Sequence, residues 1–180
     1  TRSGQIANDC SPARRSWDFH ESGCTDATCL FVVATAQHLA THPDESLRRR
    51  LWPHLRRAAA WLEAQDANQF TLIDSPMGGD WMDSTLQRSG KLLYVNVLYH
   101  RALTGLASLA PNPTSAQRYA GRADLLRHKL NAFLWPEPDF AYSGMLEGVR
   151  FPNGAEVAFP RPVGPAAHLR AVDRDRRFYI

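Results

Sequence analysis

The sequence predicts an all-α protein with four long helices. Apolar residues recur at the three- and four-residue spacing of a helix through four segments, which is the main indication. Two of these segments are apolar almost all round, and each is followed by an amphipathic segment. This order predicts two copies of one unit, a buried inner helix followed by an outer helix, with a period of about 65 residues.

The first unit is expected to begin at residues 27–40, "ATCLFVVATAQHLA". A helix that is apolar on every side is expected to be buried on every side, and Thr25 or Asp26 is expected to cap its start. The second helix is expected at residues 44–65, with arginines opposite an apolar stripe. The stripe consists of Leu47, Leu51, Leu55, Ala59 and Leu62.

The second unit repeats this pattern. A largely apolar helix is expected at residues 90–110 and an amphipathic helix at residues 114–135. The chain after Trp135 is rich in proline and glycine, which predicts an irregular C-terminal tail with a small hairpin near "EVAF". Asn96 lies within the third helix, where its side chain is expected to be buried and to satisfy backbone groups or a neighbour. Residues 1–180 are therefore expected to form a single domain.

Composition excludes several classes of protein. Hydrophobic residues make up 44% of the chain and charged residues 22%, which is ordinary for a soluble globular protein and argues against disorder. The net charge of +3 comes mostly from arginines spread along helices, without the clustered stacking aromatics of a nucleic-acid interface. No apolar run reaches membrane-spanning length and no signal peptide opens the chain. Neither a nucleic acid nor a membrane is expected as a partner.

The three cysteines, Cys10, Cys24 and Cys29, form no CxxC pair. An odd number at these spacings predicts reduced thiols and a cytoplasmic protein rather than a disulfide framework. A zinc site from His20, Cys24 and Cys29 is the weaker alternative, because paired-ligand spacings are missing. No metal is therefore predicted.

The two loops that lead into the inner helices are the most chemically loaded parts of the chain. Parallel inner helices place their N-termini at one end of the molecule, so residues 17–26 and 74–90 are expected to meet there. Aromatic rings stack on sugars, and carboxylates hold hydroxyls or move protons, so this end is predicted to bind carbohydrate. The side chains concerned are Trp17, Asp18, His20, Glu21, Asp26, Asp80, Trp81 and Asp83.

Three stretches, "ESGCTDATCLFVVA", "LWPHLRRAAAWLEAQD" and "GGDWMDSTLQRSGKLLYVNVLYHRAL", together resemble the six-hairpin glycosidases. The likeness is strongest to the amylo-α-1,6-glucosidase domain of glycogen-debranching enzymes and their bacterial relatives, and it covers roughly residues 4–135. It implies a partial (α/α)6 toroid of alternating inner and outer helices. It also implies a hydrolase that cleaves α-glucosidic bonds of an oligo- or polysaccharide by inversion, without a cofactor.

The resemblance also assigns roles to single residues. The "WMD" motif implies that Asp83 is the general acid, although an aspartate at this place also fits a helix cap. The "DA" pair implies that Asp26 binds the sugar in the cleavage subsite, while Trp81 is expected to form a subsite wall. Further substrate contacts are expected from Asp80, Glu21 and Lys91.

Four helices are fewer than the twelve that close such a barrel, and the family's general base comes from later in the chain. The first residue is Thr1 rather than methionine, which predicts a fragment with little activity of its own. Exposed inner-helix faces would then favour self-association. Two other classes stay open, a non-catalytic carbohydrate-binding module and a helical scaffold.

Overall fold

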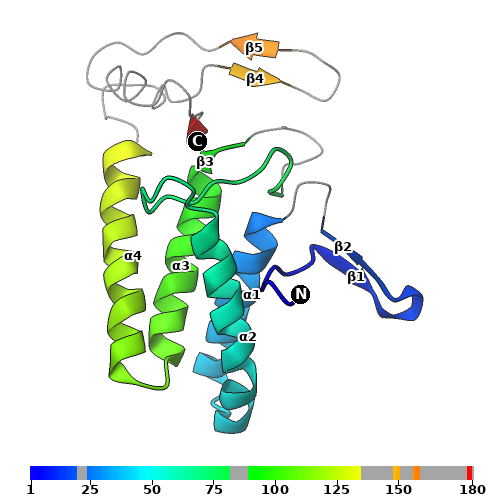
Figure 1. Ribbon diagram of the computed structural model, residues 1–180, viewed down its shortest axis with the longest axis vertical. Coiled ribbons are helices and arrows are strands. Elements are labelled where there is room, and N and C mark those ends of the chain that lie inside the picture. The colour runs from blue at the N-terminus through cyan, green and yellow to red at the C-terminus, as the bar shows by residue number, and fades with distance from the viewer. Residues whose placement is uncertain (20–23, 82–88, 135–147, 151–155, 159–177, 180) are drawn as a thin grey trace.

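The computed structural model describes residues 1–19, 24–81, 89–134, 148–150, 156–158 and 178–179. Within these residues the protein is mainly helical, with four α-helices and short strands (Figure 1). This agrees with the prediction of a mainly helical protein with four long helices, and each helix lies within a few residues of its predicted range. The helices are α1 (Thr25–Thr41), α2 (Glu45–Ala64), α3 (Leu93–Leu109) and α4 (Pro113–Phe133).

The four helices run alternately down and up, so that α1 and α3 point the same way (Figure 1). The closest packing is that of α3 against both α1 and α4, while α2 contacts α1 and α3. The N-termini of α1 and α3 therefore lie at the same end of the molecule, as the repeat predicts (Figure 1). The loops before these two helices are brought together at that end.

The described strands form three small two-stranded sheets. Strands β1 (Asp9–Ser11) and β2 (Ser16–Asp18) pair antiparallel around the short 3-10 helix η1 (Pro12–Arg14). The prediction of a plain loop from residue 17 onward is wrong for its first two residues, because Cys10 pairs with Trp17 across this hairpin. The other pairs are β4 (Gly148–Arg150) with β5 (Glu156–Ala158), antiparallel as expected near "EVAF", and β3 (Lys91–Leu92) with β6 (Phe178–Tyr179), parallel.

The helix starts divide into two kinds. Helices α2 and α4 are capped by the side chains of their N-cap residues, because Asp44 accepts from Leu47 N at 2.9 Å and Asn112 accepts from Ser115 N at 2.8 Å. Helices α1 and α3 have Cys24 and Leu92 at the N-cap position, and neither side chain makes a capping hydrogen bond. The prediction of a Thr25 or Asp26 cap is therefore wrong, since α1 already includes both residues.

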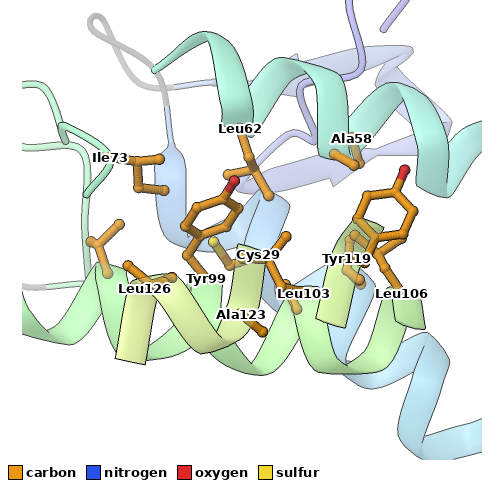
Figure 2. Close-up of a cluster of buried hydrophobic side chains, with 14 of the residues drawn as sticks. Cys29, Ala58, Leu62, Ile73, Tyr99, Leu103, Leu106, Tyr119, Ala123 and Leu126 are labelled. Atoms are coloured by element: carbon orange, nitrogen blue, oxygen red, sulfur yellow. The ribbon is translucent and has the colours of Figure 1, made fainter. Parts of the chain in front are cut away.

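One core joins all four helices. Cys29 of α1, Leu62 of α2, Leu103 of α3 and Leu126 of α4 are fully buried in a single cluster, together with the Tyr99 ring (Figure 2). Burial of side chains of this size is the main favourable contribution to folding, about 1.5–3 kcal/mol each. The apolar stripes read from the sequence are thus the faces that pack.

The expectation that the inner helices are buried all round is wrong. Leu30 of α1 is 44% exposed and Val97 of α3 is 45% exposed among the described residues. The reason is that the packing on α1 comes from α2 and α3, which leaves Leu30 on an uncovered side. No helix in the described part of the chain combines the length and the apolar character needed to cross a membrane.

Candidate functional site

Two carboxylates come together where α1 begins. Asp26 is 5% exposed and Asp80 is 4% exposed, and the two are close enough for the charge of Asp80 to act on Asp26. Asp26 belongs to the first turn of α1, whereas Asp80 comes from the loop that precedes α3. Residues far apart in the sequence thus form one acidic pair, as predicted from the parallel inner helices.

Backbone N–H groups hold the Asp26 carboxylate in place. The amide of Ala27 donates to Asp26 Oδ1 at 2.7 Å, and the backbone amides of Trp81 and Asp26 also donate to this carboxylate. Burial, followed by the charge of Asp80, raises the pKa of Asp26, while these hydrogen bonds oppose the rise. The net effect is a carboxyl group that holds its proton to higher pH than an exposed aspartate does.

Such a pair suits the recognition of hydroxyl groups. The Asp26 carboxyl accepts hydrogen bonds when it is ionised and donates one when it holds its proton, which its raised pKa favours. The Thr25 hydroxyl oxygen is also buried at this helix start, and it has no hydrogen-bond partner among the described residues. An uncompensated buried hydroxyl is costly, which makes it a group that a ligand or a water molecule would satisfy.

Trp81 lies directly after the pair in the sequence and is 63% exposed. Its ring meets Tyr94, in the first turn of α3, edge to face, with 6.2 Å between ring centroids and 68° between ring planes. A large aromatic ring that is held by another ring and still exposed is a surface for stacking. The predicted subsite wall is thus an accessible ring beside the acidic pair.

The loop carrying Asp80 is tied down at both ends. Near its start, Ser75 exchanges two backbone hydrogen bonds of 2.8 Å with Gly90, and the Gly79 amide donates to Pro76 O at 2.9 Å. At its far side, the Thr25 amide donates to Gly79 O at 3.1 Å. The position of the pair is therefore set by backbone contacts to the start of α1 and to the segment before α3.

The Lys91 ammonium is held by groups of the protein itself. Its side chain is buried, and Nζ donates to Leu72 O at 2.5 Å and to Asp74 Oδ2 at 3.0 Å. Two of its three donors are thus engaged by the segment that enters the loop. The substrate role of Lys91 stays a prediction, while its structural role is visible.

Asn96 performs the role expected of a buried amide. Its Oδ1 accepts from Ile73 N at 2.8 Å, and its Nδ2 donates to Ile73 O at 3.0 Å and Leu92 O at 2.9 Å. The sequence indicated that Asn96 needs partners, but it gave no means of identifying Ile73 as one of them. Sequence reasoning also missed Asp74, which does not stand out in a loop rich in polar residues, and it expected Thr25 to be a helix cap rather than a buried hydroxyl without a partner in the described part of the chain.

The predicted acid Asp83 and the predicted contact Glu21 lie outside the described residues, as does His20. Of the alternative zinc ligands, Cys24 and Cys29 are both buried, and burial raises the pKa of the Cys29 thiol. Within the described ranges no group of three histidine, cysteine or acidic side chains is arranged to hold a metal ion.

Neither the protein-family models nor the curated proteins compared with this chain match it.

Proposed function

We propose that this chain carries the sugar-binding and acid-donating part of a glycoside hydrolase that cleaves α-glucosidic bonds by inversion. Its proposed type is the amylo-α-1,6-glucosidase of glycogen debranching. The observation that carries the proposal is the Asp26–Asp80 pair, buried next to the exposed Trp81 ring at the common end of α1 and α3. The resemblance of "DWMD" and of the "DA" pair at Asp26 to that family supports it.

In this proposal the sugar ring stacks on Trp81 and its hydroxyls bond to Asp26 and Asp80. Asp83 protonates the glycosidic oxygen as the bond breaks, and a second carboxylate activates water on the opposite face of the ring. Inversion needs about 6.5–9.5 Å between these two carboxyl groups. The resemblance places the second carboxylate later in the family's chain.

The proposed architecture is part of an (α/α)6 toroid, with α1 and α3 as inner helices and α2 and α4 as outer helices. It is supported by the parallel course of α1 and α3 and by the alternation of direction along the chain (Figure 1). The exposed Leu30 and Val97 side chains then belong to faces through which such chains associate. The three free cysteines support a reducing, cytoplasmic compartment.

Sugar binding is tested first. Panose and maltotetraose are titrated calorimetrically into the wild type, Asp26→Asn and Asp83→Asn. Asp124→Asn is the matched control, because this exposed α4 carboxylate pairs with Arg127 rather than with the site. We expect Asp26→Asn to weaken binding at least about tenfold, since buried polar recognition is lost, while Asp83→Asn and the control bind as the wild type does.

Hydrolysis is tested with the same sugars, on this chain and on any longer product of the same reading frame. Loss of the general acid should lower kcat by about 10²–10⁴ in Asp83→Asn. Proton NMR of freshly released glucose should show the β-anomer. Binding that depends on Asp26 without any turnover favours the non-catalytic sugar-binding alternative. Identical behaviour of all variants, with no sugar bound, favours the scaffold alternative.

A further inference from the structure

A separate cavity of about 380 Å³ lies between the N-terminal segment and the β1–β2 hairpin. Its volume is within the range of about 300–1,000 Å³ that ligand pockets occupy. Its walls combine the aromatic rings of Trp17 and Phe19 with the polar side chains of Gln5, Asn8 and Asp9. The cavity is thus polar and aromatic at once, and none of its lining residues belongs to the acidic pair.

Trp17 is the most informative residue in this cavity. It lines the cavity and is nevertheless 62% exposed, so it is not a core side chain. Its strand position is fixed, because Trp17 pairs with Cys10 across the hairpin and the Asn8 amide donates to Asp18 O at 2.8 Å. An exposed indole on a fixed backbone, next to amide and carboxylate side chains, is an arrangement that binds a sugar ring.

The inner end of the cavity is anchored to the helices. The Ile6 amide donates to Thr28 Oγ1 at 3.1 Å, within α1 and two residues after Asp26. Gly4 lies against the backbone of α2, where a Cβ atom would come within 2.0 Å of Arg57 O. Thr28 follows Asp26 by two residues, a rise of about 3 Å and a rotation of about 200° around α1, so the segment that lines the cavity packs on the first turns of α1 but on a different face from Asp26.

We propose that this cavity is a second sugar subsite. It takes a pyranose ring beyond the second ring of an oligosaccharide whose terminal ring binds at Asp26, so that a disaccharide is too short to reach it, and it therefore rests on the proposed function. The ring stacks on Trp17, while Gln5, Asn8 and Asp9 bond to its hydroxyls. Among the described residues that line the cavity, Asp9 carries the one charged side chain.

The test measures how affinity depends on oligosaccharide length. Glucose oligomers with α-1,4 links, of two to six residues, are titrated into the wild type, Trp17→Ala, Trp17→Phe and Arg14→Ala. Arg14 is a matched control because it lies in η1, on the same hairpin, and does not line the cavity. Trp17→Ala should weaken binding of the longer oligomers about fivefold to tenfold and leave the disaccharide unchanged, while Trp17→Phe retains most of the affinity.

A second measurement uses the unaltered protein, so that it does not depend on how a variant folds. The indole N–H resonance of Trp17, assigned by comparison with Trp17→Phe, should shift with the longer oligomers and stay in place with the disaccharide. An equal loss of affinity at every length, no loss at all, or an unmoved Trp17 resonance would each overturn the second subsite.

The two proposals fail separately. Length-dependent binding through Trp17 without release of glucose keeps the subsite and overturns hydrolysis. Turnover that depends on Asp83 with no effect of Trp17→Ala keeps the proposed function and overturns the subsite. Absence of binding of any oligomer to the wild type overturns both.

Discussion

The amide nitrogen of Thr25 lies 3.1 Å from the carbonyl oxygen of Gly79. Thr25 is the first residue of α1, and Gly79 belongs to the loop that precedes α3. The N–H groups of the first turn of a helix have no partner within the helix, and in α1 no side chain of the N-cap residue supplies one. A loop distant in sequence satisfies the first of these groups, and the same contact sets Asp80 beside Asp26.

Gly105 allows α1 and α3 to approach closely. A Cβ atom at Gly105 would lie 2.7 Å from the Cβ of Ala36, which cannot move without its helix. Gly105→Ala should therefore lower the free energy of unfolding by about 1–3 kcal/mol, measured by chemical denaturation. Adding Ala36→Gly should recover part of the loss.

Gly121 on α4 has open space around it, so Gly121→Ala should instead stabilise by about 0.5–1 kcal/mol. Equal effects of Gly105→Ala and Gly121→Ala on the free energy of unfolding would contradict the close approach of α1 and α3 at Gly105.

Lys91 is a buried side chain that stabilises the segment leading into the loop before α3. Lys91→Met keeps most of the apolar stem but removes the donor to Leu72 O, leaving a buried carbonyl without that partner. The loss should be about 1–3 kcal/mol, because Asp74, the other partner, is partly exposed and regains water. Thermal and urea unfolding measure it. Arg49→Met, at an exposed position of α2, is the control and should change stability by less than about 0.5 kcal/mol.

Asn96 faces carbonyl oxygens on one side of its amide. In Asn96→Asp both side-chain atoms become acceptors, and the atom that replaces Nδ2 faces Ile73 O and Leu92 O. The carboxyl should therefore fold with a raised pKa. Its stability contribution is then present below the unfolded pKa and lost as pH rises through the folded pKa. The free energy of unfolding, measured with urea, should fall more at neutral than at acidic pH, by about 2–4 kcal/mol near pH 7.

The matched control for Asn96 is Asn112→Asp, at the N-cap of α4. Asparagine and aspartate cap helices almost equally well, so this variant should stay within about 0.5 kcal/mol of the wild type. A similar, small effect at Asn96 would show that its amide does not face the two carbonyls.

Asp26 makes the wild type sensitive to pH in the acid range. Its pKa is raised from 3.8 by burial and by Asp80, so protonation is favoured in the folded state. The sign follows directly: the stabilising contribution is complete below 3.8 and is lost as pH rises through the folded pKa. The asparagine of Asp26→Asn cannot ionise. The free energy of unfolding of this variant, relative to that of the wild type, should therefore increase as the pH rises from 3.8 through the folded pKa of Asp26. Thermal unfolding of both proteins from about pH 3 to 7 measures it, and a constant difference would refute the assignment.

The three thiols should differ in reactivity. Cys10 is exposed, Cys24 and Cys29 are buried, and burial raises the pKa of Cys29. Since the thiolate is the reactive form, a disulfide reagent should label Cys10 quickly in the native protein and all three cysteines after unfolding. Cys10→Ser should abolish the fast reaction. Fast labelling of a second thiol in that variant would show that the start of α1 opens readily.

The sequence alone determined the four helices and their apolar faces. Periodicity encodes these features locally, because a helix can bury only the stripe that its own residues form. The starts of α2 and α4 were equally local, since Asp44 and Asn112 each bond to an amide three residues ahead. The parallel order of α1 and α3 also followed from the repeat, and with it the meeting of Asp26 and Asp80.

Tertiary structure decided the details of the candidate site. The partner of the Thr25 amide at the start of α1 is Gly79, and the partners of the Lys91 ammonium are Leu72 and Asp74, all of them distant in the sequence. The hydrophobic periodicity also did not predict the β1–β2 hairpin with its Trp17 cavity. Nor did it predict that Leu30 is exposed. A buried donor or acceptor must find a partner wherever the fold provides one, and periodicity carries no information about partners that are distant in the sequence.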